Sequence, residues 1–271
     1  MNLFYRSKGS GIPLVILHGL YGSSDNWNQI AKMLPADYWV ISVDLRNHGA
    51  SPHSTTHTYD EMVTDLAWLF HELEIERAHL LGHSMGGKVA IAFAADYPEK
   101  ILSLTVADIA PRNYFITPAS AIQYDFHKRT LKVLSEIDLS KHHTRTDVEK
   151  ELKQEIPEKL VRQFILKNLH RTKNQLEWKI NVPVLKKQLE HIISGVDAND
   201  YSDRIPINQY PVLFIRGSLS GYIQKEDVEI IHKMYPEAKL ETIEDATHFL
   251  HAEKPGEFVE KLVNFLKTVH N

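Results

Sequence analysis

The chain has 271 residues, of which 43% are apolar and 24% charged, a composition that excludes a disordered or fibrous protein. It carries 31 Lys and Arg against 35 Asp and Glu, and this net charge of −4 lacks the basic surplus of a nucleic-acid binder. Cysteine is absent, which excludes a disulfide scaffold, a thiolate metal site and a cysteine nucleophile. Neither a signal peptide nor a membrane-length apolar run is recognisable, so we expect a cytoplasmic protein without membrane contact.

Short apolar runs alternate with amphipathic stretches, which predicts an α/β fold with a mostly parallel sheet and helices on both faces. The predicted strands are Leu14–Leu17, Trp39–Val43, Ala78–Leu81, Leu102–Ala107 and Val212–Ile215. Leu240–Ile243 alternates apolar and polar residues, which favours a strand nearer the sheet edge. The helices predicted between and after these strands are Thr58–Leu73, Met85–Asp96 and Pro255–Val269.

Residues 111–210 break this alternation and show helical patterning only. Thr146 to Glu149 matches a capping box, and Pro157 suits the first turn of a second helix. Pro183–Ile193, which Gly195 follows, indicates another helix. We expect this segment to form a helical cap over the carboxyl ends of the strands, where open α/β sheets bind ligands.

The domain organisation follows from this insertion. Residues 1–110 and 211–271 are expected to form one core domain, and 111–210 the helical cap. Aromatic residues of the cap that are candidates for a substrate pocket are Phe164, Tyr124 and Trp178.

The segment Gly82-His83-Ser84-Met85-Gly86 fits the G-x-S-x-G pattern and lies between a predicted strand and a predicted helix. A nucleophile elbow requires this context, because its turn is so tight that small residues must flank the serine. The serine then projects above the sheet, and the next amide is free to bind an oxyanion. We predict Ser84 as a covalent nucleophile; the other interpretation is a glycine-rich turn with an exposed serine.

A second turn, His18-Gly19-Leu20, ends the first strong strand. Gly19 permits a sharp bend that directs the Leu20 amide at the space above Ser84. The amides of Leu20 and Met85 would then form an oxyanion hole. His18 is expected to be a packed histidine that holds this loop.

A serine nucleophile needs a neutral imidazole to accept its proton, and sixteen histidines are available. In enzymes with a nucleophile elbow of this kind, the histidine lies in the loop after the last strand, where His248 and His251 occur. We favour His248, because His251 begins the approach to the final helix. The remaining histidines lack the arrangement of metal ligands, so no metal site is predicted.

The histidine in turn needs a carboxylate that fixes its tautomer. Asp108 ends the run Leu102–Ala107 and should emerge at the same sheet edge as Ser84. Asp227 is the alternative, although acidic residues in a first helical turn commonly complement the helix dipole. Asp245 is only three residues from His248 and is interpreted as a turn residue.

With these residues placed, the chain resembles the α/β-hydrolase superfamily over nearly its whole length, and more narrowly the YbfF-type bacterial carboxylesterases. The similar segments are HGLYGSSDNW (18–27), VDLRNHGASP (43–52), GHSMGGK (82–88), ADIAPRNY (107–114), INVPVL (180–185) and THFLHAEKP (247–255). The resemblance implies an α/β-hydrolase fold with a cap and a monomeric or homodimeric esterase. Such an enzyme acts on short acyl esters, or also acyl thioesters, without a cofactor.

One departure from the superfamily concerns the acid. Many members carry an Asp in the loop after the strand Val212–Ile215, whereas Gly217–Tyr222 contains none. The similar esterases use the Asp of the ADIAP-like segment, which here is Asp108.

Three functions remain open at this point. The first is a serine hydrolase of small-molecule acyl esters, in which Ser84 attacks and His248 moves the proton. The second is a lyase of the menaquinone-pathway type, which has a similar elbow but tends to carry Arg where this chain has Lys88. The third is a catalytically silent binding protein, because a fold does not imply a function. The presence of both a nucleophile and a base favours the hydrolase.

Overall fold

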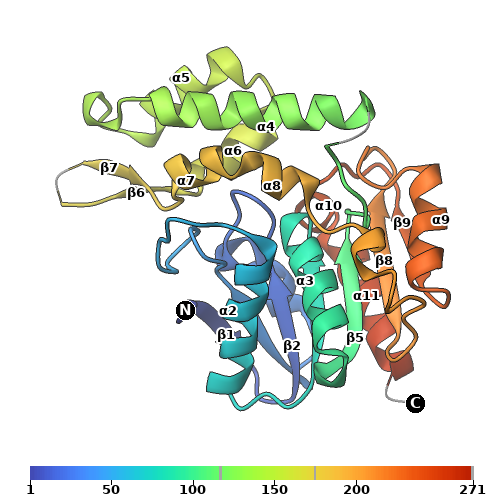
Figure 1. Ribbon diagram of the computed structural model, residues 1–271. Coiled ribbons are helices and arrows are strands. Elements are labelled where there is room, and N and C mark those ends of the chain that lie inside the picture. The colour runs from blue at the N-terminus through green and yellow to red at the C-terminus, as the bar shows by residue number, and fades with distance from the viewer. Residues whose placement is uncertain (116–117, 174, 270–271) are drawn as a thin grey trace.

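The structure is a computed structural model that describes residues 1–115, 118–173 and 175–269, with the side chains of all of these except 118–121. Within these residues a seven-stranded sheet has the order β1-β3-β2-β4-β5-β8-β9. Figure 1 shows β1 and β2 toward one side of the sheet and β8 and β9 toward the other. β1 pairs antiparallel with β3, and the other neighbours are parallel. The strands are β1 (Tyr5–Lys8), β2 (Ile12–Leu17), β3 (Tyr38–Val43), β4 (Ala78–His83), β5 (Ile101–Ala107), β8 (Val212–Gly217) and β9 (Lys239–Ile243).

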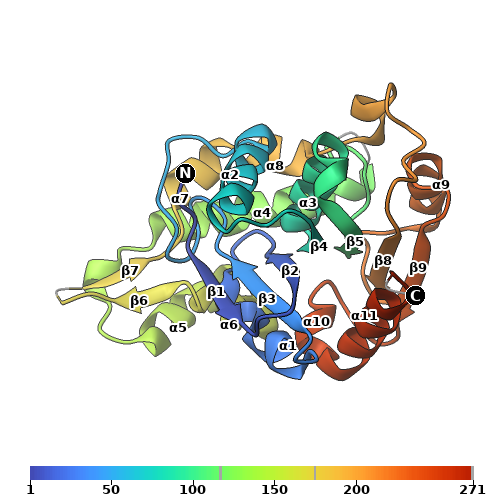
Figure 2. The ribbon, with the colours of Figure 1, turned by 90° about the horizontal axis from the view of Figure 1, so that it is seen from below.

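Helices cover both faces of this sheet. Figure 2 shows α2 and α3 on one face and α1 and α11 on the other. The helices of the core are α1 (Asn28–Met33), α2 (Tyr59–Glu72), α3 (Met85–Asp96), α9 (Lys225–Met234), α10 (Leu250–Glu253) and α11 (Pro255–Val269). The α/β class with a mostly parallel sheet is therefore confirmed.

Successive residues of a strand pack into two different cores. In β2, Val15 and Leu17 belong to the cluster that contains the apolar residues of α2 and α3. Leu14 and Ile16 belong to the cluster that contains those of α1 and α11. Because both faces of the sheet are covered, its inner strands are apolar at consecutive positions.

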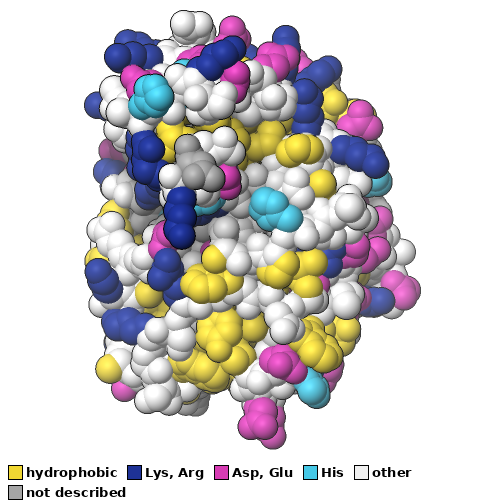
Figure 3. Space-filling model, turned by 90° about the vertical axis from the view of Figure 1, so that its left-hand side faces the viewer, with side chains coloured by type: hydrophobic (Ala, Val, Ile, Leu, Met, Phe, Trp, Pro, Cys, Tyr) yellow, Lys and Arg dark blue, Asp and Glu magenta, His cyan; other side chains and the backbone are white. Residues whose placement is uncertain are grey.

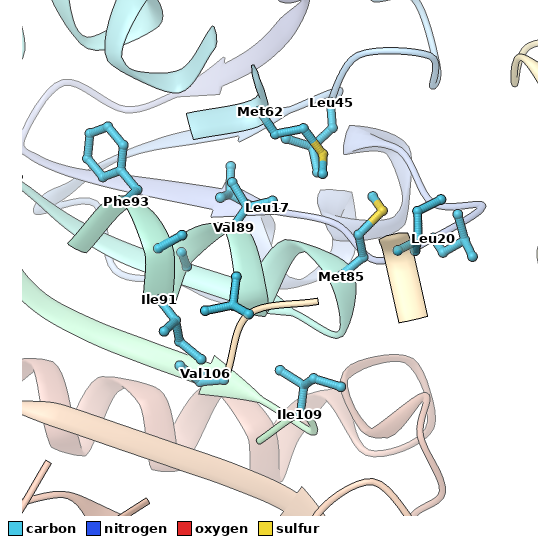
Figure 4. Close-up of a cluster of buried hydrophobic side chains, with 14 of the residues drawn as sticks. Leu17, Leu20, Leu45, Met62, Met85, Val89, Ile91, Phe93, Val106 and Ile109 are labelled. Atoms are coloured by element: carbon cyan, nitrogen blue, oxygen red, sulfur yellow. The ribbon is translucent and has the colours of Figure 1, made fainter. Parts of the chain in front are cut away.

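Figure 4 shows part of the first cluster, with Val89 and Phe93 of α3 among its side chains. Met85 and Leu20 lie at one end of this cluster and are only 4% and 8% exposed. Burial of these two side chains therefore anchors the two backbone positions that the sequence marks as oxyanion-hole donors.

The predicted strands are confirmed, each with boundaries within two residues of those expected. Leu240–Ile243 lies in β9 at the edge of the sheet, as its alternating pattern indicates. The sequence did not reveal β1 at the opposite edge. Its residues are mostly exposed, so they carry no apolar run by which a strand is recognised.

The chain between β5 and β8 lies across the carboxyl ends of the parallel strands (Figure 1). Its elements are α4 (Pro118–Glu136), α5 (Arg145–Glu155), α6 (Lys159–Leu166), β6 (Leu169–Arg171), β7 (Leu176–Trp178), α7 (Val182–Lys187) and α8 (Leu189–Ser194). The antiparallel pair β6–β7 was not expected in a helical segment. Strands of three residues are too short to show a period that distinguishes them from a helix.

Two helix starts in this segment differ from those predicted. Thr144, not Thr146, is the N-cap of α5, where its side chain accepts a hydrogen bond from the Asp147 amide. Starting the helix at residue 145 buries Val148 and Leu152 against the rest of the segment. Pro157 lies before α6 rather than in its first turn, because Glu158 is the N-cap of that helix.

The surface carries charges of both signs. On the face in Figure 3, Lys and Arg side chains are present together with Asp and Glu, and exposed hydrophobic side chains lie among them. In the described part of the chain, no helix combines the length and apolar character needed to cross a bilayer.

The first turn of α3 lies unusually close to the end of β2. A Cβ atom built at Gly86 would be 2.5 Å from the His18 carbonyl oxygen and 2.6 Å from that of Leu17. Both contacts are with backbone, which cannot rotate away. Only glycine fits at this crossing.

We therefore expect Gly86→Ala to destabilise the protein by about 1–3 kcal/mol, the range for overpacking in a core. Gly256→Ala is the matched control, because nothing lies within 4 Å of a Cβ there and alanine favours a helix more than glycine does. Urea unfolding of the two variants and the parent measures the difference. Equal stability of the two variants would show that the crossing does not restrict residue 86.

Candidate active site

Ser84 occupies a strained turn between β4 and α3. Its backbone dihedrals are φ 54° and ψ −121°, which non-glycine residues rarely adopt. The turn is held by its amide, which donates to the Ala107 carbonyl on β5 at 3.0 Å, and by its carbonyl, which accepts from the Lys88 amide at 3.1 Å. The serine hydroxyl is thereby presented at the carboxyl edge of the sheet.

The structure brings together the three side chains that the sequence marked for this chemistry. His248 Nε2 lies 2.9 Å from Ser84 Oγ, and His248 Nδ1 lies 2.7 Å from Asp108 Oδ2. Asp108 is fully buried, and its carboxylate accepts further hydrogen bonds from the Gly217 amide at 3.1 Å and from the Ser220 hydroxyl. These donors compensate for the loss of water around the carboxylate.

Asp108 reaches His248 because β5 and β8 are neighbours. Its own amide donates to the Ile215 carbonyl at 2.8 Å, and its φ of 52° turns the side chain toward the loop after β8. The alternative acid, Asp227, is engaged elsewhere: one oxygen pairs with Arg112 Nε at 2.9 Å and the other accepts from the Gln224 amide. The loop without an acidic residue instead contributes donors to Asp108.

Contacts from several elements position His248. The Tyr222 ring stacks on its imidazole with centroids 3.8 Å apart, and the His83 ring nitrogen Nε2 donates to its carbonyl at 2.8 Å. The amide and hydroxyl of Thr247 both bind the Glu253 carboxylate at 2.7 Å. The sequence did not indicate these roles for Tyr222, His83 or Glu253, since each depends on a contact with another segment or on the folded geometry of its own loop.

Three further histidines lie near His248; His83 and His251 are buried, and His127 is half-buried. Burial lowers the pKa of His127 to about 3 and that of His251 to about 3, and it brings the pKa of His83 well below its ordinary value. His251, the alternative base, stacks on Trp27 at 4.4 Å and is 3% exposed. These three imidazoles are therefore neutral at physiological pH.

His127 of α4 bridges two loops of the core. Its Nδ1 lies 3.3 Å from the Tyr21 hydroxyl and its Nε2 lies 3.2 Å from the Tyr222 hydroxyl. A neutral imidazole has one donor and one acceptor nitrogen, so one tyrosine donates to the ring and the other accepts. Asn168 adds a second link, since its amide nitrogen donates to the Tyr21 carbonyl at 2.6 Å.

The loop after β2 is held from within the core. His18 Nε2 accepts from the Leu45 amide at 2.9 Å and its Nδ1 donates to the Gly19 carbonyl at 2.8 Å, which confirms a packed histidine. Gly19 is needed for a different reason from the one predicted. A Cβ there would lie 3.0 Å from that of Ser84, whereas the positive φ of the loop falls on Tyr21.

The two candidate oxyanion-hole amides, of Leu20 and Met85, directly follow the two residues of this close contact, Gly19 and Ser84. Met85 is the first residue of α3, where an amide has no partner within the helix. Leu20 follows Gly19 directly, and both Leu20 and Ser84 line the cavity above the site. The backbone thus places both residues beside the serine.

A cavity of about 720 Å³ opens above Ser84. Its apolar lining includes Leu20, Phe126, Val161, Phe164 and Phe249. The predicted pocket residue Phe164 is among them, and its ring packs on Phe249 with centroids 4.9 Å apart.

Tyr124 and Trp178 do not line this cavity. On α4 the residues on either side of Tyr124 face the cavity, whereas Tyr124 lies on the opposite side of the helix, where it meets Phe115 and Lys128. Trp178 lies on β7, beside a shallow outer pocket. Their aromatic character alone did not indicate which way each side chain points.

Among the described residues, no group of three or more His, Cys, Asp or Glu side chains is arranged to hold a metal ion. The groups that the site itself presents are the Ser84 hydroxyl, the His248 imidazole, the Asp108 carboxylate and the neighbouring amides.

Comparison with known proteins places this arrangement in a family. A family model described as the alpha/beta hydrolase fold matches residues 12–255. The chain belongs to the α/β-hydrolase family. Its fold and the resemblance predicted from its motifs are thereby confirmed.

Several α/β-hydrolases are similar over most of the chain. Esterase YbfF of Escherichia coli K12 is 33% identical over 261 residues, covering 96% of this chain and 95% of YbfF. The sn-1-specific diacylglycerol lipase ABHD11 of Danio rerio is 37% identical over 265 residues, covering 97% and 81%. A solved structure titled "Marine microorganism esterase" superposes with a TM-score of 0.89 at 41% identity, covering 97% and 99%.

Proposed function

We propose that this α/β-hydrolase is a carboxylesterase that cleaves short acyl esters of small molecules, through an acyl-enzyme intermediate on Ser84. The observation that carries the proposal is the hydrogen-bonded series Ser84–His248–Asp108 beneath an apolar cavity. The relatives named as esterases and lipases support ester hydrolysis as its reaction.

The proposed mechanism assigns one role to each group. His248 Nε2 accepts the hydroxyl proton as Ser84 Oγ attacks the ester carbonyl, and the amides of Leu20 and Met85 stabilise the oxyanion. The protonated His248 then donates to the leaving alcohol oxygen, and the acyl group stays on the serine. Water, deprotonated by His248, hydrolyses that intermediate. Asp108 holds the imidazole in the required tautomer and stabilises its cation.

Ser84→Ala should lower kcat for ester hydrolysis by at least about 10³-fold, because no other group at the site supplies the nucleophile. Ser135→Ala is the matched control, since Ser135 is exposed on α4. Labelling with a fluorophosphonate probe should mark the parent and Ser135→Ala but not Ser84→Ala. A labelled, active Ser84→Ala enzyme would refute the proposed nucleophile.

Substitution of the two buried aspartates, Asp108 and Asp227, distinguishes a role in catalysis from a role in stability. Asp108→Asn should reduce kcat by on the order of 10⁴, since an amide cannot fix the required imidazole tautomer. Asp227→Asn breaks its ion pair with Arg112 and should lower the unfolding free energy with little change in kcat. Steady-state kinetics and urea unfolding of both variants make the comparison, and the reverse kinetic pattern would move the acid to Asp227.

The pH dependence follows from the low pKa values of two imidazoles near His248. Burial keeps the pKa of His127 and of His251 at about 3, so neither gains a proton between pH 8 and 5. Loss of the neutral base is then a single protonation, so log(kcat/KM) should fall with a slope of one as the pH is lowered. A slope of two would mean that a second imidazole is protonated, and a flat profile would exclude His248 as the base.

A further inference from the structure

Two cavities meet at Ser84, and they differ greatly in size. The large cavity, already described, has a volume of about 720 Å³, whereas a small cavity that Ser84 also lines has about 30 Å³. Ser84, Leu20, Gln123, His127 and Tyr222 line both. The hydrogen bond between His127 and Tyr222 therefore lies in the wall that the two cavities share.

Only the large cavity is lined by His248 and Phe249. The small cavity is instead lined by Met85, the first residue of α3, together with Tyr59, Ile109 and Ile193. The catalytic base and the candidate oxyanion-hole residue Met85 thus mark different sides of the serine.

The chemistry of ester cleavage assigns one part of the substrate to each side. The leaving alcohol oxygen receives its proton from His248 Nε2, so it must lie within hydrogen-bonding distance of that atom. The alcohol therefore extends into the large cavity. Once the oxyanion faces the Leu20 and Met85 amides, the direction left for the acyl chain is toward the small cavity.

The volume of the small cavity limits the acyl chain. A group the size of a water molecule or a methyl group needs about 10–15 Å³ of cavity volume. The small cavity, at about 30 Å³, therefore holds about two or three such groups. Acetyl and propionyl groups have one and two carbons beyond the carbonyl, whereas a hexanoyl group has five. A longer chain would have to displace the lining.

That lining is held in place. The Tyr59 hydroxyl donates to the Ile192 carbonyl at 2.8 Å. Lys88, which is 2% exposed, donates from Nζ to the carbonyls of Arg112 at 2.7 Å and Ser194 at 3.2 Å. These hydrogen bonds connect α2 and α3 to α8 and to the start of the inserted segment at Arg112. Widening the small cavity would therefore require breaking them.

We infer that the substrates of this enzyme are esters of acetic or propionic acid with larger apolar alcohols, the acyl group lying in the small cavity and the alcohol in the large one. This inference rests on the proposed function and adds to it the distribution of the substrate over the site.

Two isomeric esters test the assignment. Hexyl acetate and ethyl hexanoate have the same composition and similar hydrophobicity, but the long chain lies on the alcohol in the first and on the acid in the second. We expect kcat/KM to be at least about tenfold higher for hexyl acetate, because overfilling a packed cavity costs about 1–3 kcal/mol. Equal values or a preference for ethyl hexanoate would overturn the inference.

A pair of variants locates the discrimination. Ile193→Ala, which enlarges only the small cavity, should raise kcat/KM for ethyl hexanoate relative to ethyl acetate at least about fivefold. Phe164→Ala enlarges only the large cavity and should leave that ratio unchanged while altering the preference among alkyl acetates. The opposite pattern would assign the acyl chain to the large cavity. The isomer pair decides the matter on the parent enzyme if Ile193→Ala does not fold.

Fluorophosphonate labelling separates failure of this inference from failure of the proposed function. An enzyme labelled at Ser84 that prefers ethyl hexanoate, or cleaves neither ester, refutes the substrate assignment alone. Absence of labelling at Ser84, with no hydrolysis of either ester, refutes the proposed function together with it.

Discussion

The geometry of the site depends on the close approach of α3 to the end of β2. Because Gly86 touches the carbonyls of Leu17 and His18, the helix begins directly against the loop that follows the strand. That crossing brings the Leu20 loop, the elbow at Ser84 and the first amide of α3 into one small volume. The strained dihedrals of Ser84 persist there because strand pairing on one side and the helix on the other leave no room to relax.

Around this crossing, side chains fix the backbone of each loop before any substrate arrives. His18 holds the Gly19 turn, His83 holds the carbonyl of His248, and Ser220 binds the carboxylate of Asp108. Burial keeps the pKa of His18 and of His83 low, so both serve as neutral hydrogen-bonding groups rather than as charges. A site whose dipoles are already oriented needs little reorganisation when charge develops on the substrate.

The inserted segment completes the site because its two ends are close together. It leaves the core after β5 and returns at β8, and these strands are neighbours in the sheet. Lys88 joins the start of the segment, at Arg112, and the end of α8, at Ser194, to α3, and His127 joins the longest helix of the segment to the loops that carry Tyr21 and Tyr222. The same contacts that attach the segment also divide the space above Ser84 into a large and a small cavity.

The amino-acid sequence by itself determined six of the seven strands of the main sheet, the elbow at Ser84 and the loop that holds His248, because period, turn sterics and chain order are local properties. It also indicated Asp108, since adjacent parallel strands end at one edge. It predicted Tyr124 and Trp178 as pocket residues, although neither lines the cavity above Ser84. It did not reveal the stacking of Tyr222 on His248 or the hydrogen bonds of His127 to two tyrosines. The directions of Tyr124 and His127 depend on how α4 is rotated about its axis, and the surroundings of Trp178 and Tyr222 depend on residues far apart in the chain. Only the packing of the whole inserted segment on the sheet decides that rotation, since no local pattern records which side of a helix will meet a cavity.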